Sequence, residues 1–476
     1  LIIPANSAAA SGGYAVDNSV RLDGSSSYMT KSMGTPTNID KYSFSFWVKR
    51  SKLGVQQSIF RSTNGAASND SHVTFQADDT LRFEEYGGSA SIGKLQTTQV
   101  FRDISAWYSI LLVYDSGNGT AGNRMRMYVN GTEVTAFGTD NNPSQNADSF
   151  FNKSGETLSF GRTPYSGGGN YFSGYVAELV MCDGQALTPT DIGEFDEDSG
   201  IWKPIDVSGL TFGTNGFYLD FENSGALGAD VSGNTNNFTV NNLTAIDQST
   251  DTCTNNFATM NPLDNFYAGG TFAEGNLQVV TRDTGYSYNT STFGVATGKW
   301  YWEVKWSAQN TGSTNQVLIG IAKRTVPSTT TWLGSQLYTY GYQGSDGHVK
   351  NNNGNATGSS ATTYSVGDII SVALDLDNNK IHFAKNGTYT NSSDPAGNSG
   401  GVTITAPDST SGDSGFYFPA FGDGNNNLVE TGQFNFGSPP YSESGGETDG
   451  NGYGNFAHEP PSGYYALNTK NLAEYG

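Results

Sequence analysis

Short runs of alternating apolar and polar residues constrain the fold of this chain more than any other feature. Residues 42–49 read Tyr-Ser-Phe-Ser-Phe-Trp-Val-Lys, and residues 300–306 read Trp-Tyr-Trp-Glu-Val-Lys-Trp. A period of two is typical of a β-strand that buries one face in a core. Similar runs follow in 72–183 and 316–421, about ten residues apart with polar turns between them. Short strands at this spacing predict two-sheet sandwiches.

The two strand-rich regions share one pattern. In the first, the run 110–115 leads into a Gly/Asn turn, a strand and the pair Asn130-Gly131. In the second, the run 370–375 leads into the same order, ending at Asn386-Gly387. Asn-Gly supplies the two positive-φ positions of a type I′ hairpin turn. The repetition favours two sandwiches of the same general kind.

The sequence therefore predicts an all-β protein with two antiparallel β-sandwich domains joined by a loop-rich connector. Its 61 glycines and 13% aromatic residues are typical of neither a disordered nor a helical chain. We expect a first sandwich in 1–200, a connecting segment with short strands in 201–285, and a second sandwich in 286–440. A linker and a docking tail are expected in 441–476.

The charge balance excludes several classes of partner. With 24 Lys+Arg against 45 Asp+Glu, the net charge of −21 repels phosphate backbones and anionic lipid headgroups. No apolar run reaches the length of a membrane span, and the first residues lack the pattern of a signal peptide. We expect no nucleic-acid partner and no membrane insertion. Cys182 and Cys253 can pair, although the apolar run 175–182 favours a buried free thiol at Cys182.

Five motifs between residues 15 and 196 occur in a characteristic order: 20–28, 44–48, 107–115, 127–132 and 172–179. In this order they resemble the concanavalin A-like sandwiches of the laminin G (LamG) type. The resemblance implies a jelly-roll sandwich in the first region.

Motifs of the second region lie within residues 286–437, at 298–304, 317–322, 367–377, 381–387, 418–421 and 434–437. This region resembles a SPRY domain. The strongest match is Gly367-Asp-Ile-Ile-Ser-Val-Ala-Leu-Asp-Leu-Asp followed by Ile381-His-Phe-Ala-Lys-Asn-Gly.

Three further segments, 183–189, 255–263 and 466–472, join these modules in a combination that resembles virion proteins of marine bacteriophages. The resemblance implies a tail-fibre or receptor-binding component on the virion, an extracellular particle surface. It also implies other virion proteins and a host-surface glycan or receptor as partners, and a homo-oligomer such as a trimer. The alternative is a structural virion protein, a capsid decoration or tail-assembly connector, that uses its sandwiches for protein–protein contacts.

Concanavalin A-like folds also include glucanases, so the sequence can be checked for their catalytic motif, a strand with the pattern E-x-D-x-x-E. Carboxylates two residues apart on a strand face the same side, which brings the nucleophile and the general acid close together. The nearest match is 194–199, Glu-Phe-Asp-Glu-Asp-Ser, which ends in Ser199 and follows the last predicted strand of the first sandwich. The four histidines show no metal-ligand spacing. We expect a solvated acidic turn and no enzyme.

Calcium is the candidate metal, because LamG-type domains often hold it with carboxylates and loop carbonyls. By loop position the candidates are Asp78, Asp79, Asp115 and Asp148. No EF-hand pattern supports them, and most such aspartates bond their own turns. We therefore expect no required cofactor and retain calcium as an open alternative.

Two aromatic loops are candidates for ligand binding. Tyr165 and Tyr171 lie in a Gly-rich stretch, and Trp332, Tyr338 and Tyr342 lie in the second region. Aromatic faces stack on sugar rings, and loops held by rigid sandwiches carry binding sites. The alternative, which strict alternation favours, places the tyrosines at 338, 340 and 342 on the inner face of a strand.

Overall fold

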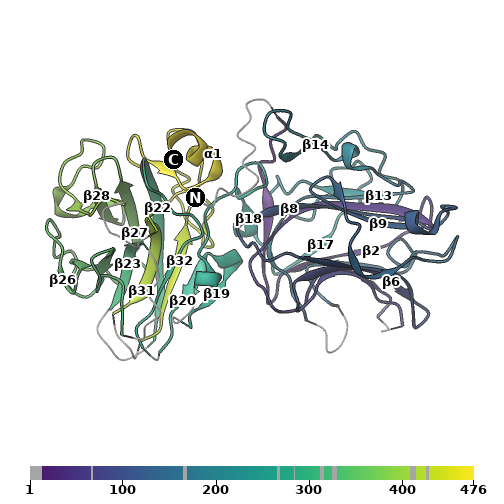
Figure 1. Ribbon diagram of the computed structural model, residues 1–476, viewed down its shortest axis with the longest axis horizontal. Coiled ribbons are helices and arrows are strands. Elements are labelled where there is room, and N and C mark those ends of the chain that lie inside the picture. The colour runs from purple at the N-terminus through teal and green to yellow at the C-terminus, as the bar shows by residue number, and fades with distance from the viewer. Residues whose placement is uncertain are drawn as a thin grey trace. The chain divides into compact units, whose positions relative to one another are not determined.

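The computed structural model of the protein describes residues 13–65, 68–164, 169–264, 269–283, 285–310, 316–323, 330–407, 414–424 and 428–476. The chain forms two compact units (Figure 1). The N-terminal unit ends at Asn256, and the C-terminal unit runs from Phe257 to Gly476. The predicted all-β class is confirmed, since α1 (Thr469–Tyr475) is the one α-helix in the described residues. No helix in these ranges is long and apolar enough to cross a membrane.

Two antiparallel sheets face each other in the N-terminal unit (Figure 1). Sheet A has the order β10 (Thr132–Glu133), β9 (Met125–Val129), β8 (Trp107–Asp115), β3 (Lys41–Arg50), β13 (Ser173–Asp183), β1 (Ser19–Asp23) and β18 (Gln248–Ser249), with β16 (Phe217–Leu219) also on β13. Sheet B has the order β11 (Phe137–Asn141), β7 (Ala90–Val100), β6 (Thr80–Gly87), β5 (Ser71–Phe75), β4 (Gln57–Thr63), β12 (Thr157–Phe160), β2 (Tyr28–Ser32) and β17 (Thr239–Asn241). A separate ribbon pairs β14 (Gly193–Phe195) with β15 (Trp202–Pro204).

The core of this unit lies between the two sheets and is rich in aromatic rings. Alternation places Tyr42, Phe44, Phe46 and Val48 of β3 on this inner side, where all four are fully buried. The ring of Phe44 stacks on that of Phe60 from sheet B, with centroids 4.8 Å apart. The inward face expected from the alternation is therefore confirmed.

The other face of sheet A is covered by residues from 187–218, which form a second apolar cluster with Trp47. Cys182 and Cys253 belong to this cluster, and both are free and buried. The expected buried thiol at Cys182 is thus confirmed. Burial raises the pKa of Cys182 to about 12, so its thiol stays protonated.

Residues 201–285, expected as a connecting segment, are divided between the units. Strands β16, β17 and β18 extend the sheets of the N-terminal unit, whereas β19 (Thr271–Ala273) and β20 (Gln278–Val280) extend a sheet of the C-terminal unit. The physical reason is that short edge strands satisfy backbone groups that a sheet edge would leave unpaired.

The C-terminal unit is also built from two sheets. Sheet C has the order β19, β20, β32 (Glu430–Asn435), β22 (Lys299–Gln309), β27 (Ile369–Asp375), β28 (Lys380–Lys385) and β29 (Thr388–Tyr389), with β30 (Val402–Thr403) on β28 and β33 (Tyr465–Ala466) on β22. Sheet D has the order β21 (Tyr288–Thr290), β31 (Phe418–Asp423), β23 (Val317–Ala322), β24 (Thr339–Gln343), β25 (Val349–Asn351) and β26 (Gly354–Asn355). Trp300, Trp302 and Trp306 of β22 all lie in its core.

Both predicted Asn-Gly turns are present. Asn130 and Gly131 have φ of 47° and 74°, and Asn386 and Gly387 have φ of 47° and 78°. Glycine and asparagine tolerate this left-handed region better than other residues do. The two hairpins therefore close in the same way in both units.

The last residues of the chain pack on the C-terminal unit through a buried carboxylate. Strand β33 pairs in parallel with β22. Next to this pairing, the fully buried Glu303 accepts hydrogen bonds from the backbone N–H groups of Ala457 and His458, both at 2.9 Å. Its carboxylate also accepts from Tyr301 Oη and Asn435 Nδ2, both at 3.0 Å. Glu303 thus fixes the C-terminal segment to the sheet.

Candidate functional site

The aromatic residues expected in the second region do not form one exposed platform. Tyr340 and Tyr342 are 3% and 1% exposed and lie in the core, as the inner-face alternative describes. Tyr342 donates a hydrogen bond to the carbonyl oxygen of Thr362. Trp332 is half-buried against a small apolar cluster, and Tyr338 is also half-buried. Only the last two therefore present part of a ring to solvent.

Two of the four aspartates named for calcium, Asp78 and Asp79, bond to neighbouring side chains. Asp79 forms ion pairs with Arg50 and Arg102, at 3.1 and 2.9 Å. Asp78 accepts hydrogen bonds from Thr80. These two carboxylates are therefore engaged within the protein.

Asp115 and Asp148 both lie near the carboxylate of Asp40. Both raise the pKa of Asp40, after the larger effect of burial. Asp115 also pairs with Lys41 at 3.4 Å. In the described part of the chain, no group of three or more His, Cys, Asp or Glu side chains could hold a metal ion.

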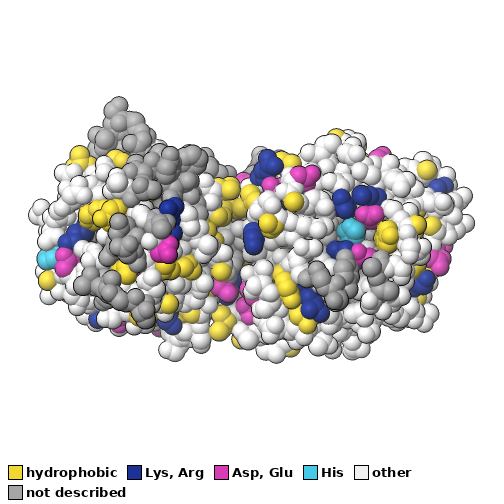
Figure 2. Space-filling model, turned by 90° about the horizontal axis from the view of Figure 1, so that it is seen from below, with side chains coloured by type: hydrophobic (Ala, Val, Ile, Leu, Met, Phe, Trp, Pro, Cys, Tyr) yellow, Lys and Arg dark blue, Asp and Glu magenta, His cyan; other side chains and the backbone are white. Residues whose placement is uncertain are grey.

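A row of polar side chains crosses the outer face of sheet B. Its members are directly paired from strand to strand in the order Thr239, Thr30, Ser159, Arg61, His72, Glu84, Lys94 and Asn141. Their chain neighbours Phe60, Val73, Phe83 and Leu95 point into the core. Alternation thus separates a polar face from an apolar one, and Figure 2 shows basic and acidic side chains gathered around a histidine on this unit.

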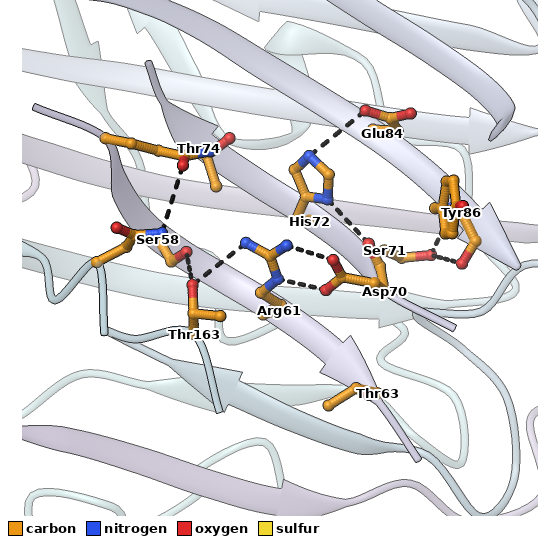
Figure 3. Close-up of polar contacts among 12 residues, drawn as sticks. Ser58, Arg61, Thr63, Asp70, Ser71, His72, Thr74, Glu84, Tyr86 and Thr163 are labelled. Atoms are coloured by element: carbon orange, nitrogen blue, oxygen red, sulfur yellow. Dashed lines mark hydrogen bonds and ion pairs between the residues drawn. The ribbon is translucent and has the colours of Figure 1, made fainter. Parts of the chain in front are cut away.

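Arg61 organises the middle of this row (Figure 3). Its Nε and Nη2 donate to the two carboxylate oxygens of Asp70, which precedes β5. Its Nη1 donates to Thr163 Oγ1 at 3.2 Å, and that hydroxyl lies 2.9 Å from Ser58 Oγ. A two-pronged arginine–carboxylate contact fixes both side chains in one orientation. The guanidinium is therefore held in one position on the sheet.

His72 lies next to Arg61 and carries an unused acceptor. Its Nδ1–H donates to the carbonyl oxygen of Asp70 at 2.8 Å, so the neutral ring has its lone pair on Nε2. That Nε2 lies 3.4 Å from Glu84 Oε2 and has no hydrogen-bond partner. Burial and the charge of Arg61 lower the pKa of His72 to about 4, so the ring is neutral at pH 7. Arg61, His72 and Glu84 are 5%, 7% and 6% exposed, so only a small part of each side chain reaches the surface of the sheet.

Glu84 links the histidine to the basic end of the row. Its Oε2 lies 3.6 Å from Lys94 Nζ and 3.9 Å from an Arg82 nitrogen. Arg82 also donates to Gln96 Oε1 at 2.9 and 3.1 Å. Fixed donors and acceptors thus alternate across three neighbouring strands.

An aromatic edge borders the polar row. Residue 162 follows β12, and the Arg162 guanidinium lies 3.5 Å from the centroid of the Tyr28 ring. The Tyr28 ring lies 6.5 Å from that of Tyr171, one of the residues named from the sequence. All three are half-buried, so part of each remains accessible. Tyr165, named with Tyr171, lies outside the described residues.

The acidic turn at 194–199 is part of the ribbon β14–β15. Asp196 accepts hydrogen bonds from the N–H and Oγ of Ser199, at 2.9 and 2.8 Å, and these bonds lower its pKa to about 2. Glu194 and Asp196 both pair with Lys203, at 3.2 and 3.3 Å.

Comparison with known proteins assigns both modules. Residues 23–193 match the family model of the concanavalin A-like lectin/glucanases superfamily, and residues 299–439 match that of the SPRY domain. The chain therefore contains a LamG/concanavalin A-like domain and a SPRY domain. No curated protein sequence matches the chain.

Three solved structures are similar to parts of this chain at low identity. The SPRY domain of human HERC1 has 18% identity and a TM-score of 0.26, over 33% of this chain and 87% of that one. A Bacteroides ovatus ATCC 8483 protein to which carbohydrate binding is ascribed has 16% identity and a TM-score of 0.33, over 48% and 60%. The heptameric SAP-like pentraxin of Limulus polyphemus has 18% identity and a TM-score of 0.28, over 37% and 79%.

We expect the N-terminal unit to lose stability as the pH falls from 6.5 toward 4. The folded-state pKa of His72 is depressed, so the unfolded chain binds its proton first, and acid favours unfolding in this window. The contribution is up to about 3 kcal/mol. Urea unfolding at pH 7 and pH 4.5 should show a larger acid loss for the wild type than for His72→Gln. Equal losses would contradict this assignment.

Proposed function

We propose that this is a carbohydrate-binding protein whose N-terminal unit binds glycan on the outer face of sheet B. The observation that carries the proposal is the polar row, in which Arg61, His72 and Glu84 are held in fixed positions by their neighbours. Sugar hydroxyls both donate and accept hydrogen bonds, and immobilised partners lower the entropy cost of binding them. The match to a superfamily that includes lectins supports the same class of ligand.

The dimensions of the row favour an oligosaccharide over a single sugar. Strands in a sheet lie about 4.8 Å apart, so the four positions from Arg61 to Lys94 span about 14 Å. The rings of Tyr28 and Tyr171 at its border offer apolar faces for sugar C–H groups. A chain of sugars lying across the strands would use both features.

The proposal is one of binding without catalysis and without a required cofactor. The carboxylate pattern of the glucanases is incomplete at 194–199, which supports the first part. Calcium bound near Asp115 and Asp148 is the alternative to glycan binding without a cofactor.

The biological setting that we propose is the surface of a phage virion, where the protein would serve as a tail-fibre or receptor-binding component. The motifs at 183–189, 255–263 and 466–472 support this setting by resemblance. The expected partners are host-surface glycan and other virion proteins, with the protein acting as a homo-oligomer, such as a trimer.

Glycan binding by the purified protein tests the function. On a glycan array we expect saturable binding, which His72→Gln and Glu84→Gln should each weaken about tenfold, the value of one hydrogen bond to a charged or fixed group. Trp332→Ala, in the other unit, is the control and should bind like the wild type. An arm with EDTA tests calcium.

Two outcomes would contradict the site or the function. Binding that survives both sheet B substitutions and is lost in Trp332→Ala would place the site in the C-terminal unit. No binding by protein shown to be folded would favour the structural virion role.

A further inference from the structure

The outer face of sheet B has a charge balance opposite to that of the whole chain. The chain carries 45 acidic and 24 basic residues. Among the side chains that make the contacts of the polar row and its aromatic edge, Arg61, Arg82, Lys94 and Arg162 are basic and Asp70 and Glu84 are acidic, which gives 4 − 2 = +2. Local charges govern contacts closer than a Debye length, about 8 Å in physiological salt. This face is therefore suited to an anionic ligand.

Arg162 is the cation of this face that lacks a counter-ion. Arg61 is paired with Asp70, and Glu84 forms ion pairs with both Arg82 and Lys94. Arg162 forms no ion pair with any described carboxylate, and its Nε is buried without a hydrogen-bond partner. Its guanidinium lies instead on the Tyr28 ring at 3.5 Å.

Arg162 is half-buried, so part of its guanidinium is accessible to a ligand. The ring face offsets only part of the cost of taking the remainder out of water, and an anion would supply the missing acceptor. The guanidinium fork presents parallel N–H groups that match two oxygens of a carboxylate or a sulfate. The adjacent Tyr28 and Tyr171 rings can flank the sugar that carries this group.

We propose that the glycan bound on sheet B is acidic, and that Arg162 binds its carboxylate or sulfate group beside Tyr28. This inference rests on the proposed function and names its ligand class. Thr163, the next residue, bonds Arg61, so the anion site is connected directly to the polar row. The row then contacts the neutral hydroxyls of the following sugars.

Dextran, carboxymethyl dextran and dextran sulfate share one sugar backbone and differ in their charged groups. Comparing them therefore separates the effect of the anionic group on binding from the effect of the sugar. We expect one or both anionic polymers to bind the full-length protein at least tenfold more tightly than dextran. Arg162→Gln should remove this advantage, so that the three polymers bind with similar affinities. Arg162→Lys keeps the positive charge but lacks the paired N–H groups of the guanidinium, so it should retain part of the preference for anionic polymers. Preference for one anionic polymer identifies carboxylate or sulfate as the recognised group.

The matched control is Lys305→Gln in the C-terminal unit. Lys305 also lies over a tyrosine ring, with its Nζ 4.9 Å from the centroid of Tyr441. Like Arg162→Gln, this variant removes one positive charge from the chain. It should bind all three polymers like the wild type.

The inference and the underlying function can fail separately. If Glu84→Gln weakens glycan binding as expected while anionic groups and Arg162 contribute nothing, the function stands and the acidic ligand is overturned. An anionic preference that is equally lost in Lys305→Gln would also overturn it, since net charge alone would then explain binding. Absence of binding to every glycan tested, with the wild type folded, would overturn both.

Discussion

Replacing Glu303 with alanine is expected to lower the free energy of unfolding of the C-terminal unit by about 4 kcal/mol or more. The fully buried carboxylate accepts hydrogen bonds from Tyr301, Asn435, Ala457 and His458. Alanine would leave the N–H groups of Ala457 and His458 without their acceptor, and each buried unsatisfied group costs about 1–3 kcal/mol. The loss should appear as a lower urea midpoint.

Glu303→Gln is the matched control, because it keeps one acceptor oxygen and the side-chain volume. We expect it to lose clearly less stability than the alanine variant. A loss below about 1 kcal/mol for Glu303→Ala, within the range of ordinary surface substitutions, would show that Glu303 does not anchor the C-terminal segment.

Replacing Phe44 with alanine is expected to destabilise the N-terminal unit by about 3–5 kcal/mol. The ring is fully buried and touches rings from several segments. It stacks on Phe60 at 4.8 Å and meets the edges of Tyr42 and Phe151 at 5.3 and 5.4 Å. Truncation would remove these contacts and leave a cavity between the sheets. Thermal unfolding followed by near-ultraviolet circular dichroism measures the loss.

Phe195→Ala serves as the comparison for Phe44→Ala. Phe195 is 51% exposed and contacts one ring, that of Trp202, at 4.9 Å. We expect a loss below about 1 kcal/mol, because little apolar area leaves water at this position. Similar losses for the two variants would contradict the placement of the core between sheets A and B.

Alternation in the sequence was sufficient to predict the long strands and their inward faces. It places Phe44 and Phe46 together in one core, and Trp300, Trp302 and Trp306 in the other. The short strands β16, β17 and β18 were not predicted as parts of the first sandwich. Two or three residues carry no measurable period, and their pairing depends on which sheet edge lies nearby.

The candidate site could be predicted only in part. Tyr171 was named from its aromatic, Gly-rich loop, and it lies at the edge of the polar row. Arg61, His72 and Glu84 were not named, although each alternates with core residues in its strand. Alternation indicates that their side chains share a face, but only strand order and register bring them side by side.

The two buried thiols give this chain an internal probe of local opening. Cys182 and Cys253 are its only cysteines, and both lie in the N-terminal unit. A thiol reagent can modify them only when the layer over sheet A detaches or the unit unfolds, because the reactive species is an exposed thiolate. Labelling rates of the intact chain would therefore report the opening of one unit alone, with no engineered label. Saturating glycan should slow that labelling if it stabilises the same unit.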